Sequence, residues 1–284
     1  METRLSGHIR TGFHACIQRV CLLLLAVIGL TSIVPAQAAF DHGHGGFDAL
    51  LRQHVVLISD GTASEVDYAA FQSKRAALQA YLSELAAVSP GEYDAFTRDQ
   101  KLAFLINAYN AYTIDFILTR YPDIESIREL GTLFNNAWKK RLFPLLGEKR
   151  TLDEIEHEMI RKPGDFDDPR IHMAVNCASI GCPALRNEAF VASRLDEQLN
   201  DATKRFLSDR SRNRADAKAL RVSKIFDWYD EDFINHSGSV AQWLARYAEQ
   251  LSDDPEIQQA VRAGSLRVRH LDYDWALNDL QRGQ

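Results

Sequence analysis

The run Leu102-Ala-Phe-Leu-Ile-Asn-Ala-Tyr-Asn-Ala-Tyr-Thr-Ile-Asp-Phe-Ile-Leu118 is apolar at almost every position. It forms the middle of a longer stretch, residues 98–121, which we interpret as one helix. A helix that is apolar almost all the way round is buried on all sides. The sequence therefore predicts a central helix against which the rest of the domain packs.

Two amides interrupt this apolar surface. Asn107 and Asn110 are three residues apart and share one face of the predicted helix. Buried amides need hydrogen-bond partners. Two interpretations stay open: the amides bind backbone groups of neighbouring loops, or they contribute directly to a functional site.

Periodicity assigns the other elements of the chain. We expect helices over residues 47–58, 66–87, 151–161, 188–207, 239–251 and 255–263. A small hairpin over 141–150 turns at Gly147, and short strands are expected over 220–223 and 266–270. This pattern predicts a helix-rich α+β fold, a single domain with a small sheet packed on the buried central helix.

The stretch Asp168-Pro-Arg-Ile-His-Met-Ala-Val-Asn-Cys-Ala-Ser-Ile-Gly-Cys-Pro-Ala-Leu185 is the best candidate for a functional site. Residues 171–175 have β character, and the run ends at Asn176 and Cys177, directly before a Gly-Cys-Pro turn. Reactive groups often lie in loops of this kind. If residues 171–177 are extended, His172 and Cys177 point to opposite faces.

The N-terminus has the composition of a secretory signal peptide. Three arginines precede an apolar run over residues 20–34, and Ala36-Gln-Ala-Ala39 follows. An uncleaved anchor is the alternative, although the run is short for a span and none follows downstream. We expect a signal peptide over 1–38, a flexible leader over 39–46, a single domain over 47–284 and a periplasmic or secreted location.

Cleavage after residue 38 changes the formal charge from −6 to −8. An acidic chain of this kind is a poor nucleic-acid binder, and we expect a peptide, a glycan or a small molecule as partner. Once residues 1–38 are removed, we expect no stable membrane span. Cleavage also leaves Cys177 and Cys182 as the last two cysteines. An even pair in an oxidising compartment is a disulfide candidate.

Five motifs resemble the family of domain of unknown function 547 (DUF547), whose core corresponds to residues 66–207. They are Ile106-Asn-Ala-Tyr-Asn-Ala111, Ile155-Glu-His157, Asp168-Pro-Arg-Ile-His172, Asn176-Cys177 with Cys182-Pro183, and Lys224-Ile-Phe226 with Trp228-Tyr229. The ends Phe40-Asp-His42 and Tyr273-Asp-Trp275 resemble those of secreted bacterial members. The resemblance implies no established activity. A distant likeness to papain-like or transglutaminase-like thiol hydrolases is a further expectation.

Our first functional hypothesis is a thiol hydrolase or acyl transferase that acts on an amide or ester. Cys177 is the nucleophile, and an imidazole activates it. His157, beside Glu156, is the first choice of base, and His270 and His172 are the others. In this hypothesis the remaining site residues, which bind an oxyanion or substrate or shape the loop, are Asn107, Asn110 and Asn176.

The second hypothesis is a non-catalytic envelope protein in which a Cys177–Cys182 disulfide pins the loop and the motif surface binds a peptide or glycan. A reducible bridge that switches activity on is intermediate between the two. Two metal sites are also conceivable. A mature chain beginning at Phe40 places His42 third, an arrangement that binds Cu(II) or Ni(II), and the two cysteines with a histidine can bind zinc.

Overall fold

A computed structural model describes residues 39–132 and 136–283 of the 284-residue chain. The predicted signal peptide, residues 1–38, lies outside the described residues. From Phe40 onward the described chain forms one compact unit. In the parts that the structure describes, no helix is long and apolar enough to span a membrane.

The helices and strands of this unit are short apart from the central helix. The helices are α2 Gly45–His54, α3 Tyr68–Ser73, α4 Arg75–Ala87, α5 Pro90–Asp94, α6 Arg98–Leu118, α7 Leu195–Ser208, α8 Ile225–Trp228, α9 Asp230–Ser237, α10 Val240–Leu244, α11 Ala248–Leu251 and α12 Pro255–Arg262. The strands are β1 Val55–Ile58, β2 Ala63–Val66, β3 Phe143–Leu145, β4 Glu148–Arg150, β5 Arg214–Ala215, β6 Leu220–Val222 and β7 Val268–His270. The predicted helix-rich α+β fold is confirmed.

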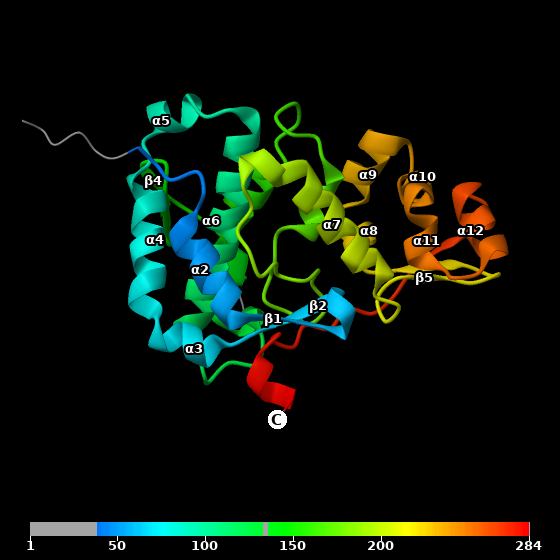
Figure 1. The fold of residues 1–284 in the computed structure, drawn as a ribbon, viewed down its shortest axis with the longest axis horizontal. Helices are drawn as coiled ribbons and strands as arrows, with labels where there is room; N and C mark the ends of the chain where they lie inside the picture. Colours follow the sequence, from blue (N-terminus) through cyan, green and yellow to red (C-terminus); the bar gives the residue numbers. More distant parts are fainter. Residues whose placement is uncertain (1–38, 133–135, 284) are drawn as a thin grey trace, which may run out of the picture. The chain divides into compact units, whose positions relative to one another are not determined.

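The central helix α6 is buried as predicted. Thr97 caps its N-terminus in a reciprocal pair with Gln100, and 16 of its residues from Leu102 to Leu118 are buried. Helix α4 packs on α6, and α2 packs on α4, so the first core surrounds α6 (Figure 1). The helix ends before Pro122, which is consistent with the position of that residue.

Local sequence explains two differences from the predicted helices at the N-terminal side. The first helix ends at His54, because Val55–Ile58, three of whose four residues are β-branched, forms strand β1 and pairs antiparallel with β2. The predicted helix over 66–87 is divided into α3 and α4 at Lys74. Asp67 caps α3 by accepting a hydrogen bond from the backbone N–H of Ala70.

The strand predicted over residues 171–175 is wrong, because this stretch is part of the 3₁₀ helix η5, Pro169–Met173. Asp168 caps η5 by accepting from the backbone N–H of Arg170, and Pro169 occupies the first turn. The expected alternation of His172 and Cys177 across a strand therefore does not apply. The hairpin predicted over 141–150 is confirmed, as β3 pairs with β4 through Leu146 and Gly147, both at positive φ.

The C-terminal part builds a second core beneath α7. Strand β6 pairs antiparallel with β5 and parallel with β7, which confirms the two strands predicted there. In the described residues the strands form three small sheets rather than one. Helices α8 to α12 bury large aromatic side chains in this second core, among them Phe226, Phe233 and Trp243. The chain thus has two buried clusters, around α6 and beneath α7.

Candidate functional site

The loop after η5 is held by its own side chains. Asn176 is 5 % exposed, donates from Nδ2 to the Pro183 carbonyl at 2.8 Å and accepts from the Ala178 N–H at 2.8 Å. This turn places Ala178 at a φ of 60°. Cys177 and Cys182 are joined by a disulfide with their Cα atoms 6.3 Å apart. The expected disulfide is therefore present in the structure.

The two amides of α6 hold backbone segments in place. Asn107 donates to the Phe190 carbonyl at 2.7 Å and accepts from the Phe190 N–H at 3.0 Å. Asn110 donates to the Ala174 carbonyl at 2.9 Å and accepts from the Asn176 N–H at 2.8 Å. Both amides therefore bind backbone groups of neighbouring segments, which was the first of the two interpretations. Asn110 holds the start of the cysteine loop in place.

The C-terminal segment closes over the cysteine loop. Ile180 and Gly181 donate backbone N–H groups to the carbonyls of Ala276 and Asp274, at 2.8 and 2.9 Å. A Cβ on Gly181 would lie 2.8 Å from the ring of Tyr273, so only glycine permits this approach. The Tyr273 hydroxyl lies 3.1 Å from the Cys177 sulfur and 3.2 Å from that of Cys182.

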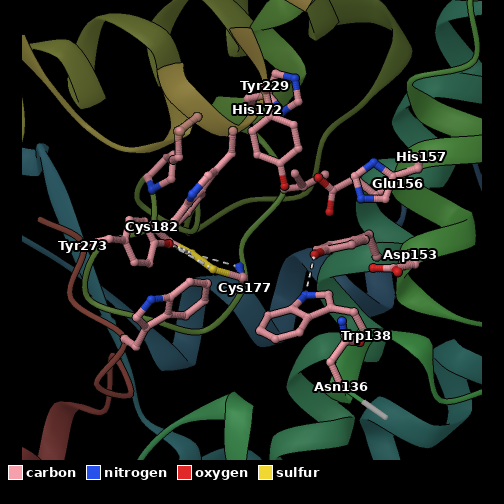
Figure 2. Close-up of a pocket in the computed structure, with 16 residues that line it drawn as sticks. Asn136, Trp138, Asp153, Glu156, His157, His172, Cys177, Cys182, Tyr229 and Tyr273 are labelled. Atoms are coloured by element: carbon pink, nitrogen blue, oxygen red, sulfur yellow. Dashed lines mark hydrogen bonds between the residues drawn. A yellow bond between two sulfur atoms is a disulfide. The ribbon is translucent and has the colours of Figure 1, made fainter. Parts of the chain in front are cut away.

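A cavity of about 270 Å³ opens beside the disulfide. Figure 2 shows the two cysteines and Tyr273 on one side of it and Asp153, Glu156 and His157 on the other. Six aromatic residues line the cavity: Tyr109, Trp138, Trp228, Tyr229, Tyr273 and Trp275. Pockets that bury a ligand are typically apolar with a few polar groups that fix its orientation. This cavity has that composition.

Glu156 and His157 lie on η4, Glu154–Ile160, which is a π-helix rather than the predicted α-helix. The wider turn is closed by the Arg161 N–H, which donates to the Glu156 carbonyl at 2.9 Å. π-Helical turns are rare and frequently lie at functional sites. The Glu156 side chain lines the cavity and is 4 % exposed, and its Oε1 has no hydrogen-bond partner.

The carboxylate of Glu156 adjoins two tyrosine hydroxyls. Burial, and secondarily this carboxylate, raises the pKa of both Tyr109 and Tyr229 well above the usual range. Both phenols are therefore neutral hydrogen-bond donors over the physiological pH range. Burial also raises the pKa of Asp153, the second carboxyl group in the cavity wall.

A histidine–carboxylate pair lies behind Tyr229. His172 is 2 % exposed, stacks on Tyr229 at 4.0 Å and donates from Nε2 to Asp232 at 2.7 Å, while its Nδ1 has no partner. Burial lowers the pKa of His172. Burial also acts to raise the pKa of Asp232, but hydrogen bonds from His172 and Arg161 outweigh it and hold that pKa below the usual range.

The structure separates the other candidate bases from the disulfide. His157 is exposed and lies 2.5 Å from Arg161 through Nδ1, and His270 lies 3.5 Å from Asp227. Among the described residues, the sulfurs contact the hydroxyls of Ser179 and Tyr273, and no histidine is within hydrogen-bonding distance of them. The structure thus brings together Cys177, Cys182, Glu156, His157 and His172 around one cavity without joining sulfur to imidazole.

The segment over 39–46 is packed against the first core. Phe40 contacts His42 and His44, and the His44 Nδ1 is 2.7 Å from the Tyr81 hydroxyl. Asp41 accepts from two backbone N–H groups at the start of α2. Within residues 39–132 and 136–283, no three His, Cys, Asp or Glu side chains are placed to hold a metal ion.

The aromatic wall of the cavity and the Asp232–Arg161 pair were not predicted from the sequence. Trp228-Tyr229 and Tyr273-Asp-Trp275 were noted only as family motifs, yet they lie beside the cysteine loop. The only signal in the sequence was that these aromatic motifs and the cysteine motif belong to the same family pattern. Because the motifs are far apart along the chain, the sequence did not show that they are in contact.

Among the comparisons with known proteins, a family model matches part of the chain. No curated protein and no solved structure matches it. Residues 93–207, which include α6, the π-helix and the cysteine loop, match the family described as protein of unknown function, DUF547. The resemblance to DUF547 is therefore confirmed over residues 93–207.

Proposed function

We propose that this chain is a disulfide-stabilised binding protein whose cavity holds part of a peptide or glycan. The observation that carries the proposal is the composition of the cavity, in which six aromatic rings and two carboxyl groups surround about 270 Å³ beside the Cys177–Cys182 bridge. Aromatic side chains provide large contact areas at little entropic cost, and the few polar groups set ligand orientation.

The state of the loop favours binding over thiol catalysis. A bridged cysteine has no thiolate, and the thiolate is the nucleophile in thiol chemistry. The amides of Asn107, Asn110 and Asn176 each donate to a backbone carbonyl, and none of the three lines the cavity, so they are not placed to bind an oxyanion there. The disulfide instead fixes the wall of the cavity.

We further propose that the protein acts in the periplasm or outside the cell, after removal of residues 1–38. The disulfide supports this location, because such bonds persist in oxidising compartments. N-terminal sequencing of protein purified from its host tests the proposal. A mature chain that begins at Ala39 or Phe40 supports it, and a chain that retains Met1 in the cytoplasm contradicts it.

Tryptophan fluorescence provides the test of binding. The sequence has four tryptophans, of which Trp138, Trp228 and Trp275 line the cavity and Trp243 lies in the second core. A panel of peptides and glycans is titrated into the oxidised protein. We expect a saturable change in emission with at least one ligand. The same change is expected in the Cys177→Ser/Cys182→Ser protein, provided that circular dichroism shows it folded.

A thiol-dependent activity after reduction is the second candidate, because Cys177 itself lines the cavity and contacts the hydroxyls of Tyr273 and Ser179. Alkylation and intact mass before and after reduction separate the two functions. We expect no alkylation at Cys177 or Cys182 without reductant. Two alkylations without reductant, with labelling of Cys177 by an acyl-directed probe, would replace the binding proposal with the thiol hydrolase.

A further inference from the structure

A carboxylate oxygen in the cavity wall lacks the partner that burial normally requires. The Glu156 side chain is 4 % exposed, and its Oε1 accepts no hydrogen bond in the structure. Buried polar atoms are almost always paired, and a carboxylate oxygen can only accept. An unpaired acceptor in the wall of a cavity indicates a ligand that donates an N–H or O–H there.

The aromatic wall favours a positively charged donor. The rings of Trp228, Tyr273 and Trp275 lie 4.6–5.5 Å apart in pairs, and Trp138 is 5.9 Å from Trp275, so they form one continuous surface. A cation within about 6 Å of such a ring is attracted by the negative face of the π system. The combination of rings with a carboxylate suits an organic cation.

The charges around the cavity agree with this assignment. Asp153 and Glu156 are its carboxyl groups, and no Lys or Arg belongs to its wall among the residues that the structure describes. Two guanidinium groups lie against rings of the wall: that of Arg161 is 4.9 Å from Tyr229 and binds both oxygens of Asp232, and that of Arg128 is 5.3 Å from Trp275. Lys139 lies near Asp153 but does not line the cavity. Among the described residues Glu156 forms no salt bridge with a Lys or Arg, and Arg161 interacts with it only at longer range.

We propose that the cavity binds the primary ammonium group of a peptide, such as the end of a lysine side chain. The ammonium donates to Glu156 Oε1, and the methylene stem lies along the aromatic rings. A lysine has one charged end on an apolar stem, which matches this wall, whereas a sugar carries many hydroxyls that need polar partners. A quaternary ammonium has no N–H for Oε1. The inference rests on the binding function proposed above and names its ligand class.

Calorimetry with two matched probes tests this proposal in the oxidised full chain. Nα-acetyl-lysine methylamide has the ammonium group, and Nα-acetyl-norleucine methylamide has the same side chain without it. We expect the lysine probe to bind at least about tenfold more tightly, because a hydrogen bond to a charged group is among the stronger polar interactions. Glu156→Gln should remove that preference. Glu158→Gln, an exposed position on the same π-helix, should retain it.

The outcomes separate this inference from the binding function. Equal affinities for the two probes in the unmodified protein overturn the ammonium assignment while the cavity remains a binding site. Binding of glucosamine without binding of the lysine probe overturns the peptide assignment in favour of an amino sugar. Failure of every peptide and glycan to change tryptophan emission overturns the binding function itself. The comparison of probes in the unmodified protein needs no variant, so it holds even when Glu156→Gln is unstable.

Discussion

Two sets of buried polar side chains in this protein differ in whether their hydrogen bonds are complete. Around α6, Asn107 and Asn110 each use both donor and acceptor on backbone groups of distant segments. In the cavity wall, Glu156 Oε1 and His172 Nδ1 have no partner. Paired groups hold a fold together, and buried unpaired groups carry a desolvation cost that a ligand can offset. The residues of the first set stabilise the fold around the site, and those of the second set are available to bind a ligand.

The largest effect should follow from removal of a paired amide. Asn110→Ala leaves the Ala174 carbonyl and the Asn176 N–H buried without partners, so we expect the free energy of unfolding to fall by about 4 kcal/mol, about 2 for each group. Urea denaturation measures this value. Thr113→Val on the same helix is the control, because the Thr113 hydroxyl is buried without a partner and its removal should be neutral or stabilising. If the two variants lost equal amounts of unfolding free energy, the distinction between paired and unpaired buried groups would be wrong.

The next effect concerns His44, which is intermediate because one ring nitrogen is paired with Tyr81 and the other is not. Burial lowers the pKa of His44 to about 4 from 6.5. Below pH 6.5 the unfolded chain binds this proton more tightly than the folded chain does. The contribution of neutral His44 to the free energy of unfolding is therefore fully present above pH 6.5. About 3 kcal/mol of it is lost as the pH falls to 4.

His44→Asn isolates this contribution. Asparagine tolerates the positive φ of this position, retains a group for the Tyr81 hydroxyl and does not titrate. Urea denaturation at pH 7 and pH 4 should show a smaller loss of stability in the variant than in the original protein. An unchanged loss would show that other groups cause the pH dependence.

A smaller effect is expected at Gly181, where the cysteine loop meets the C-terminal segment. Gly181→Ala places a Cβ within 3.0 Å of Tyr273 and of the Asp274 carbonyl, and the resulting displacement should cost about 2 kcal/mol. Tryptophan emission should also change, since Trp275 lies on the displaced segment. Gly91→Ala, in α5 with open space around it, should leave both stability and emission unaltered. Normal stability and emission in Gly181→Ala would contradict this close packing.

The smallest effect on stability is expected in the cavity. Glu156→Gln keeps the shape of the side chain and one acceptor oxygen, and its amide nitrogen can replace the unpaired Oε1, so we expect the unfolding free energy to change by less than about 1 kcal/mol. Thermal and urea denaturation measure it. A loss as large as that of Asn110→Ala would place Glu156 among the structural residues and remove the distinction between the two sets.

The sequence predicted what local patterns determine. The continuous apolar surface of residues 102–118 predicted α6, and the turn at Gly147 predicted the hairpin, both of which are confirmed. The strand predicted over 171–175 is wrong because Asp168 and Pro169 start a helical turn that outweighs the β-branched residues after it. The cysteine pair was recognisable from its spacing and number.

The cavity was less predictable, because its wall comes from distant segments. Tyr109 lies on the central helix, Trp228 on α8 and Trp275 near the C-terminus, and no local pattern shows that they meet. The π-helical turn that carries Glu156 reads as an ordinary amphipathic helix in the sequence. Glu156 was nevertheless named, as the neighbour of the candidate base His157.

The most direct measurement is the shift in unfolding temperature that the lysine probe produces in three proteins. A ligand that binds only the folded state stabilises it. We predict a clear shift in the original protein and in Thr113→Val. In Glu156→Gln we predict a shift no larger than the one that the norleucine probe produces, and an unfolding temperature of the variant itself close to the original. A full shift in Glu156→Gln, or no shift in the original protein at saturating probe, would contradict the account that the unpaired carboxylate in the cavity binds the ligand.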